Sequence, residues 1–212
     1  MTQKAVEDPW RAALPLTGRH VCLEPLSREH GDGLRLALAG DELAQIGYTN
    51  VPAVAGVEKF IDSALDRQAA GEAFPFVVRE AAGPIVGSTR LYDLDRDVPR
   101  LTIGYTWYVP RVQRTAVNTE TKLLLLRHAF ESMGCICVGF ETSSMNLASR
   151  AAITRLGATQ EGILRNHKRH GDGSPRDTVA FSIIDSEWPD VKRNLQSRLE
   201  PSRHSTGGAD GQ

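Results

Sequence analysis

One polar segment of the chain combines residue types that could hold an anion. Arg111 and Arg114 lie among small and polar residues that end at Val117, directly before a long stretch with helical periodicity. Free backbone N–H groups and the positive dipole end of a helix N-terminus attract negative charge, and arginine adds a charge partner. Spacing alone leaves two interpretations open: a phosphate-holding turn, or a polar loop that only connects a strand to a helix.

A histidine further along the chain could accept a proton. The imidazole of His167 titrates close to working pH when it is unperturbed. It belongs to the basic run 165–169, which by itself is typical of a solvated strand end. His167 and His170 are three residues apart, but no set of cysteines or carboxylates accompanies them, so no metal is predicted. The sequence also lacks the G-x-S-x-G motif of a serine nucleophile.

The elements on either side of the polar segment would position it. Residues 102–109 are rich in β-branched and aromatic types that suit a strand, and Pro110 ends this strand because proline has no N–H for the ladder. From Asn118 onward an amphipathic helix is predicted by apolar residues at helical spacing. These residues are Leu123, Leu126, Phe130 and Met133, with Leu124, Leu125 and Ala129 widening the apolar stripe.

Periodicity and turn signals predict six further strands and four further helices. The strands are expected at residues 20–26, 74–79, 85–91, 136–142, 159–167 and 176–184. The helices are expected after a Ser27 cap, at 57–68, at 146–156 before Gly157, and from a Ser186 cap through Leu195. Residues 170–173 predict a hairpin turn. This order of elements predicts a mixed α/β sheet with helices on both faces.

Composition indicates an ordinary globular protein. The 212 residues are 41% hydrophobic and 24% charged, with a net charge of −1, which gives no general reason to expect nucleic acid or an anionic membrane as partner. No apolar run reaches the ~20 residues needed to span a bilayer, and no basic-then-apolar leader opens the chain. Three cysteines, Cys22, Cys135 and Cys137, stand in apolar surroundings and are interpreted as reduced core residues. A cytoplasmic location is expected.

Three segments are expected along the chain. Residues 1–15 are polar without a clear period and predict a flexible arm, from which Trp10 could dock elsewhere on the protein. Residues 16–199 form one predicted domain, because no composition shift or internal repeat divides them. Residues 200–212 are rich in Ser, Gly and Asp and predict a disordered tail.

The central segment resembles the acetyl-CoA-binding loop of the GCN5-related N-acetyltransferases (GNAT), in particular the RimJ/RimL-like branch that acetylates ribosomal-protein N-termini. That loop runs Gln or Arg, two residues, Gly, one residue, then Gly or Ala. Gln113, Ala116 and Asn118 align with it, so both small positions depart from the pattern. Some positions in such loops need a left-handed backbone or close approach of a phosphate, both of which glycine permits. Ala116 is nearly as small as glycine, and asparagine tolerates the left-handed region. The resemblance spans residues 18–199.

Several further residues carry the same resemblance. They are the Thr119–Glu120 pair with the following LLLLRHAFE run, Asn146 with Ser149, Arg155 with Gly157, Glu161 with Gly162, and Asp177. The resemblance implies a mixed, mostly antiparallel central sheet whose central strand pair splays apart. It also implies acetyl-CoA as co-substrate. The residues expected to bind this cofactor are Trp107, Tyr108, Val109, Gln113, Arg114, Thr115, Ala116, Val117, Asn118, Thr119, Asn146 and Ser149.

The resemblance also suggests catalytic roles. Glu141 corresponds to a general base that some family members use through water, with His167 as the second candidate. Ser149 corresponds to a hydroxyl that stabilises the departing thiolate, because Ile153 stands near where other branches place a tyrosine. Asn146 is expected to pair with pantetheine, to cap the following helix, or both. Glu141 has a competing interpretation as an exposed residue at a strand end.

The implied activity is acetyl transfer to a primary amine by direct attack on the thioester. The acceptor is a peptide or protein N-terminus, or a small amine such as an antibiotic or polyamine, and its groove is expected around residues 45–55 and the last hairpin. A homodimer is a family-level expectation. Two alternatives stay open: an acyl-CoA-binding or interaction module without catalysis, suggested by Ala116 and Asn118, and a transferase for longer acyl chains.

Overall fold

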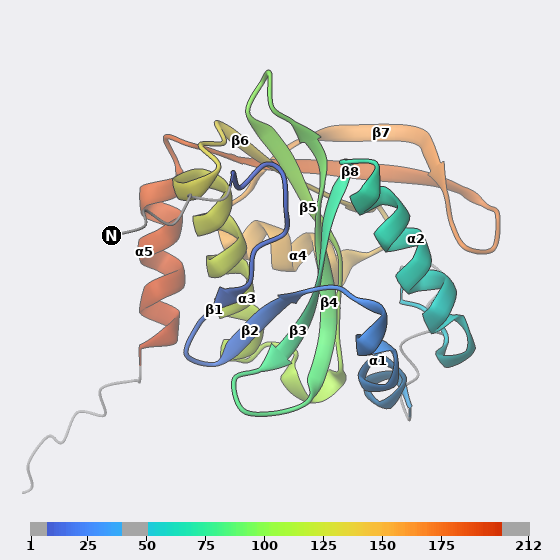
Figure 1. The fold of residues 1–212 in the computed structure, drawn as a ribbon. Coiled ribbons are helices and arrows are strands. Elements are labelled where there is room, and N and C mark those ends of the chain that lie inside the picture. Colours follow the sequence, from blue (N-terminus) through green and yellow to red (C-terminus); the bar gives the residue numbers. More distant parts are fainter. Residues whose placement is uncertain (1–7, 40–50, 201–212) are drawn as a thin grey trace, which may run out of the picture.

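A computed structural model describes residues 8–39 and 51–200 as one twisted, eight-stranded sheet (Figure 1). The strand order is β1-β2-β3-β4-β5-β6-β8-β7, and every neighbouring pair is antiparallel except β5–β6. The strands are β1 (Leu16–Thr17), β2 (Val21–Pro25), β3 (Ala73–Glu80), β4 (Ile85–Asp95), β5 (Arg100–Tyr108), β6 (Cys137–Ser143), β7 (Thr159–Arg169) and β8 (Pro175–Ile184). The predicted mixed, mostly antiparallel sheet is confirmed.

Helices cover both faces of the sheet. They are α1 (Gly31–Leu38), α2 (Val57–Ala69), α3 (Ala116–Arg127), α4 (Leu147–Leu156) and α5 (Trp188–Leu199). In Figure 1, α1 and α2 lie on one side of the central strands and the packed pair α3 and α5 on the other. Within the described residues, none of these helices is both long and apolar enough to cross a membrane.

The central strands β5 and β6 part after four residue pairs. Arg100–Ile103 pair with Cys137–Phe140, and beyond Ile103 the two strands no longer bond to each other. A bulge in β5 accompanies the parting: Gly104 lies opposite Arg90 and Trp107 opposite Ser88, so one residue of β4 faces two of β5. Tyr105 within the bulge has a φ of 51°. A Cβ on Gly104 would come within 2.7 Å of the Tyr92 ring, so glycine is needed there. The predicted splay is confirmed.

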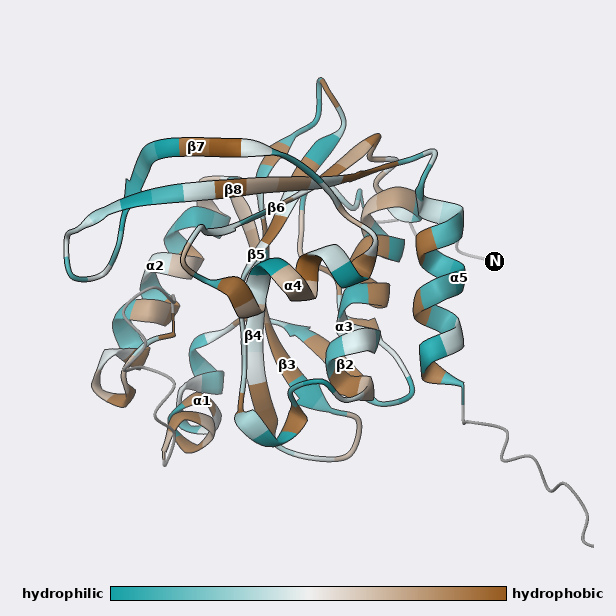
Figure 2. Ribbon diagram, turned by 180° about the vertical axis from the view of Figure 1, so that it is seen from behind, coloured by the Kyte–Doolittle hydropathy of each residue, from teal (hydrophilic) through white to brown (hydrophobic). Residues whose placement is uncertain are grey.

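Helix α3 is more deeply buried than its amphipathic pattern predicts. All four leucines 123–126 are at most 8% exposed, because the helix is packed between the sheet and α5. Figure 2 shows the resulting pattern, with hydrophobic residues on the central strands β3 and β4 and hydrophilic ones along much of α5. The helix continues into one turn of π-helix, His128–Ser132, which the sequence pattern did not indicate.

Helix ends follow local side-chain chemistry. Asn146 caps α4 because its side chain accepts a hydrogen bond from the Ser149 N–H at 3.0 Å, and Gly157 ends this helix with a φ of 101°. The predicted Ser186 cap is wrong. Helix α5 starts one residue later than that cap requires, and its N-cap residue is Glu187, whose carboxylate instead accepts from the Ile184 N–H.

The N-terminal residues that the structure describes pack onto the domain. The indole N–H of Trp10 donates to the Met133 carbonyl at 2.8 Å, which ties residues 8–15 to the end of the π-turn. The remainder of the predicted arm, the predicted tail from 201 and acceptor-groove residues 45–50 lie outside the described residues. Of the three cysteines, Cys135 is buried in the core as predicted, whereas Cys22 and Cys137 are only half-buried.

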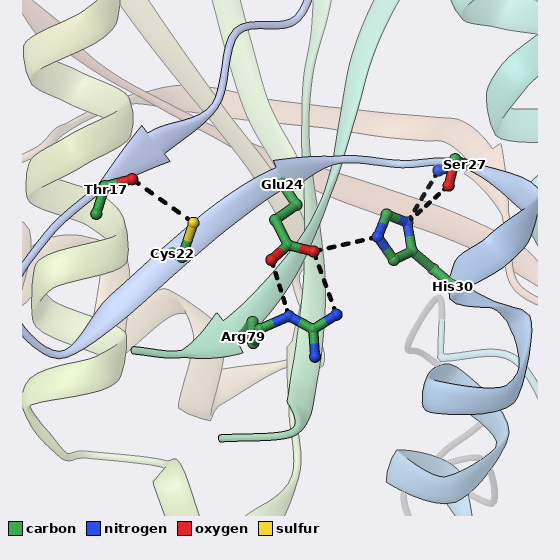
Figure 3. A network of polar contacts seen from close by, with 6 residues as sticks. All are labelled: Thr17, Cys22, Glu24, Ser27, His30 and Arg79. Carbon is green, nitrogen blue, oxygen red and sulfur yellow. Dashed lines mark hydrogen bonds and ion pairs between the residues drawn. The ribbon is translucent and has the colours of Figure 1, made fainter. Parts of the chain in front are cut away.

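A polar network stabilises the edge of the sheet near β2 (Figure 3). The Glu24 carboxylate accepts from Arg79 at 2.8 and 3.2 Å and contacts the His30 ring at 3.2 Å. His30 in turn accepts the Ser27 backbone N–H at 3.0 Å. The hydrogen bonds from Arg79 lower the pKa of Glu24, and the smaller His30 contribution acts in the same direction. Each charged group of this network therefore has its partner within the protein.

Candidate active site

A cavity of about 800 Å³ opens where β5 and β6 part. Its walls come from the second half of β5, the first turn of α3, the end of β6, helix α4 and the start of β8, with Leu195 and Arg198 of α5 closing one side. The parting leaves the backbone edge of β5 beyond Ile103 without a strand partner on the β6 side. The splay therefore creates both the space and an edge of β5 that β6 does not cover.

The segment before α3 presents several backbone donors to this cavity. The N–H groups of Arg114, Thr115, Ala116 and Asn118 find no acceptor in the part of the chain that the structure describes. The Thr115 side chain caps the helix by accepting from Val117 N–H at 3.3 Å, while its hydroxyl donates to a loop carbonyl. Consecutive free N–H groups at a helix N-terminus form a cradle for an anion.

The left-handed residue of this cradle is Arg114, with a φ of 60°. Ala116 and Asn118 both lie in the first turn of α3, where ordinary helical geometry suits any residue. The expectation that asparagine serves because it tolerates the left-handed region is therefore wrong for Asn118. Arg114 is held in this conformation by its neighbours: the Gln113 side chain donates to the Tyr108 carbonyl at 3.0 Å and so ties the loop to β5.

Positive charge predominates around the cavity. Five cationic side chains line it: Arg114, Lys122, Arg155, Arg176 and Arg198. None of them forms an ion pair with a carboxylate of the described residues. Glu141 is the one carboxylate among the described lining residues, and it pairs with Lys168. Arg111, the alternative charge partner of the predicted phosphate turn, is instead held by Glu80 at 2.7 and 2.8 Å.

Most of the predicted cofactor-binding residues lie together in this cavity. Those that line it are Trp107, Tyr108, Gln113, Arg114, Thr115, Ala116, Asn118, Thr119, Asn146 and Ser149. Val109 and Val117 do not, because their side chains are buried in the hydrophobic core. Any contact of these two residues with a ligand would have to come from their backbone.

The candidate catalytic residues divide in the same way. Glu141 is half-buried at the end of β6 and its carboxylate accepts from the Lys168 ammonium. Ser149 lies on the first turn of α4 and lines the cavity near Glu141's strand. His167 does not line it: this residue is exposed on β7 and belongs to a separate shallow depression near the hairpin turn. The structure brings Glu141 and Ser149 to one site and leaves His167 outside.

Sequence reasoning missed Lys122, which projects from α3 toward the β5 bulge. Its ammonium donates to the Thr106 hydroxyl at 3.0 Å and lies 6.0 Å from the centre of the Phe140 ring. Removal from bulk water lowers the pKa of Lys122 to about 7. Its sequence signal was weak: Lys122 directly precedes four leucines, but a single lysine at a helix position is usually solvated.

Comparison with known proteins identifies the fold family. The model of the acetyltransferase (GNAT) domain family matches residues 20–159, more than half of the chain. The chain belongs to the GNAT acetyltransferase family. A GCN5-related N-acetyltransferase from Brucella melitensis is 31% identical, with a TM-score of 0.81 over 92% of this chain and 89% of the other.

Two further proteins are similar to this chain, one in sequence and one in fold. The Bacillus subtilis protein YdaF, provisionally named a ribosomal N-acetyltransferase, is 28% identical over 52% of this chain. Only about 60% of the length of the curated relatives is matched. Mycobacterium smegmatis RimJ, solved in complex with CoA-disulfide, shares the fold at a TM-score of 0.73, with 20% identity over 89% of this chain and 95% of the other.

Proposed function

We propose that this GNAT protein is an N-acetyltransferase that moves the acetyl group of acetyl-CoA to a primary amine. The observation that carries this proposal is the cavity in the splay, where four N–H groups and several arginines at one end lack partners among residues 8–39 and 51–200. CoA is a long polyanion, and its phosphates supply the acceptors and the negative charge that this end lacks.

The cofactor would lie along the splay. Its pyrophosphate would occupy the cradle at residues 114–118, with Arg114, Arg155 and Arg198 as charge partners. The amide groups of pantetheine would bond to the free edge of β5 beyond Ile103, as a neighbouring strand would. This places the acetyl group toward Glu141 and Ser149 at the other end.

The transfer would proceed by direct attack. The neutral amine nitrogen forms a bond to the thioester carbonyl carbon, the carbon–sulfur bond breaks, and CoA leaves as a thiolate. Glu141, reached through a water molecule, would take the proton that the amine loses. The Ser149 hydroxyl would donate to the thiolate sulfur. Lys168 would keep the Glu141 carboxylate oriented, since the two side chains form an ion pair.

The demand on the base depends on the acceptor. An α-amino group has a pKa of about 8 and a lysine side chain about 10.4, so at neutral pH the α-amine is neutral roughly two hundred times more often. An α-amine could therefore react with the modest base that a solvent-connected Glu141 provides. A lysine acceptor would need stronger assistance.

A module that binds acyl-CoA without catalysis is the alternative, suggested by the missing glycines. Two measurements test both proposals, and the second separates them. Calorimetric titration with acetyl-CoA and with CoA should give micromolar binding of both under either proposal. Release of free CoA in the presence of amine acceptors should occur only for an enzyme. Absence of binding would overturn both.

Glu141→Gln tests the proposed base. The variant should lower kcat about 10²–10⁴-fold while acetyl-CoA affinity stays within about twofold, because general-base assistance contributes to the transition state alone. Glu29→Gln, at an exposed glutamate in the short 3-10 helix Arg28–His30 that follows β2, is the matched control. An unchanged pH–rate profile in Glu141→Gln would remove Glu141 from this role.

A further inference from the structure

A buried arginine on β4 has no carboxylate partner. Arg90 is 4% exposed, its guanidinium lies 4.9 Å from the centre of the Phe60 ring and 4.5 Å from that of Tyr105, and its Nε atom is buried without an acceptor in the described residues. Stacking between two aromatic rings offsets part of the desolvation cost of such a cation. It adds no negative charge, so the site keeps a positive field.

Arg90 does not itself line the cavity, but a second arginine with an unpartnered Nε within the described residues does. Arg176, near the start of β8, is half-buried, and its Nε is likewise buried without an acceptor within the described part of the chain. Its register partner on β7 is Lys168, so the residue directly opposite in this strand pair is another cation. Lys168 is already engaged by Glu141, which leaves no lining carboxylate for Arg176 among the described residues.

Two tyrosines connect these arginines at one end of the cavity. Tyr105 lines the cavity, stacks on Arg90 and meets Tyr92 edge-on at 5.2 Å between ring centres. The charges of Glu141 and Arg176 both act on Tyr92. Burial raises the pKa of Tyr92, the negative charge of Glu141 raises it further, and the positive charge of Arg176 lowers it. Arg90, Arg176 and Glu141 therefore belong to one neighbourhood around the tyrosine pair.

This neighbourhood lies at the end of the cavity that the phosphates of CoA would not occupy. The phosphate cradle and Arg114, Arg155 and Arg198 gather around the N-terminus of α3 and the C-terminal turns of α4 and α5. Glu141 and Arg176 come from the strand ends beyond the splay. Arg176, beside the ion-paired Glu141, therefore faces the space left for the acyl group and its acceptor.

We infer that the amine acceptor carries an oxyacid group, a carboxylate or a phosphoryl group, that Arg176 binds while the amine reaches the thioester. This inference rests on the proposed function. Arg90 is a positioning residue: it acts through the Tyr105 ring and adds to the field. Guanidinium binds either oxyanion through paired N–H donors. Among the acceptors considered from sequence, polycationic antibiotics and polyamines are disfavoured, because like charges would face each other.

Matched acceptor pairs test the inference. Glycine is compared with glycinamide and phosphoethanolamine with ethanolamine, with spermidine and a neutral tripeptide amide as further acceptors. CoA release is measured at saturating acetyl-CoA, and rates are expressed per concentration of neutral amine so that differences in amine pKa cancel. The anionic member of at least one pair should have the higher kcat/KM. A preference within the glycine pair would indicate that the site binds a carboxylate, and a preference within the phosphoethanolamine pair would indicate a phosphoryl group.

Variants connect that preference to the arginine. Arg176→Gln should lower kcat/KM for the anionic acceptor about ten- to hundredfold through KM, leave the neutral member within about twofold, and leave acetyl-CoA affinity unchanged. Arg176→Lys should restore part of the loss. Arg90→Met, which keeps the length of the side chain, should raise the acceptor KM less. Arg165→Gln on the neighbouring strand lies outside the cavity and serves as the control.

Each outcome decides one question. Equal or better turnover of neutral or cationic amines, or acetyl-CoA binding without turnover of any anionic acceptor, would overturn the inference. An Arg176→Gln variant that loses activity equally toward charged and neutral acceptors would also overturn it. Failure of acetyl-CoA to bind would instead overturn the proposed function, so the two failures are distinguishable.

Discussion

Glu120 and Glu24, near the first strands of the sheet, are surrounded by donors that belong to the protein. Glu120 is 7% exposed and accepts the backbone N–H groups of Arg19, His20 and Val21 at 2.6 to 3.0 Å. Gly18 makes this possible, since a Cβ there would lie 2.4 Å from the carboxylate. Around the cavity, by contrast, arginines and backbone amides lack acceptors within the described residues.

The contrast separates two uses of buried polarity. A polar group that the fold itself satisfies contributes to stability, and its removal leaves its partners unsatisfied. A polar group that the fold leaves unsatisfied lowers stability unless water or a ligand supplies its partner. Changes near Glu120 and Glu24 should therefore alter stability, and changes around the cavity should alter binding.

Glu120→Ala should produce the largest effect. Three backbone N–H groups would lose a charged acceptor, so the free energy of unfolding should fall by about 3–5 kcal/mol, measured by urea denaturation. The folded fraction should keep its affinity for acetyl-CoA, because Glu120 does not line the cavity. Glu72→Ala, an exposed site, should change stability by less than about 0.5 kcal/mol. A loss below 1 kcal/mol for Glu120→Ala would abolish the contrast.

Asn118→Asp tests the other side of the comparison. A carboxylate in the first turn of α3 would face the pyrophosphate and should weaken acetyl-CoA binding about ten- to thirtyfold, or about 1.4–2 kcal/mol, by calorimetry. An acidic residue at a helix N-terminus favours the helix itself. The melting temperature of the unliganded variant should therefore not fall. Unchanged affinity would mean that the pyrophosphate is seated elsewhere.

Lys122→Met should remove a pH dependence. Burial lowers the pKa of Lys122 to about 7 from 10.5, so between these values the unfolded chain binds a proton that the native chain does not. Stability should rise with pH across this window, by up to about 1.4 kcal/mol per pH unit. The variant should lack this contribution and be more stable than the wild type below pH 7. Lys59→Met, on the exposed side of α2, should retain the slope.

Glu24→Gln should give the smallest effect and the opposite pH window. Because Arg79 lowers the pKa of Glu24, its ion pair contributes stability above pH 4.5 that is lost as pH falls through the lowered value. At pH 7 the variant should be less stable by about 1 kcal/mol, a modest value for a partly exposed pair. The difference should vanish in acid, as measured by denaturation at pH 3 and pH 7. If the difference in stability between variant and wild type is the same at both pH values, packing and not the ion pair causes it.

Local patterns were enough to predict most of the fold. Alternation and turn residues gave β2 to β8, and capping and periodicity gave the helices, with Gly157 at its expected helix end. The bulge at Tyr105 and the π-turn were missed, because both arise where packing overrides local preference. The Ser186 cap failed for a similar reason: serine permits a cap but does not fix the first residue of a helix.

Local order alone predicted the part of the site that one segment carries, whereas Glu141, Asn146 and Ser149 came from the family resemblance. The strand, turn and helix around residues 105–131 could be interpreted from their own order, and most of the predicted cofactor residues lie together. Glu120 belonged to a recognisable pair, yet its partners are about a hundred residues away in sequence. Arg90 and Arg176 lie on different strands, β4 and β8, and both lie near the pair Tyr92 and Tyr105. The sequence around an arginine on a strand does not indicate whether its side chain has a partner.

The splay also has a mechanical consequence. The two halves of the sheet are joined by only four residue pairs between β5 and β6, so the sheet resists bending least at its middle. A pantetheine chain bound along the open edge of β5 would form hydrogen bonds there as a short neighbouring strand would. It would thereby extend the hydrogen-bonded contact along β5 beyond Ile103. Amide hydrogens of β5 beyond Ile103 should then exchange with solvent more slowly when the cofactor is bound, which makes the cofactor part of the backbone architecture as well as a reactant.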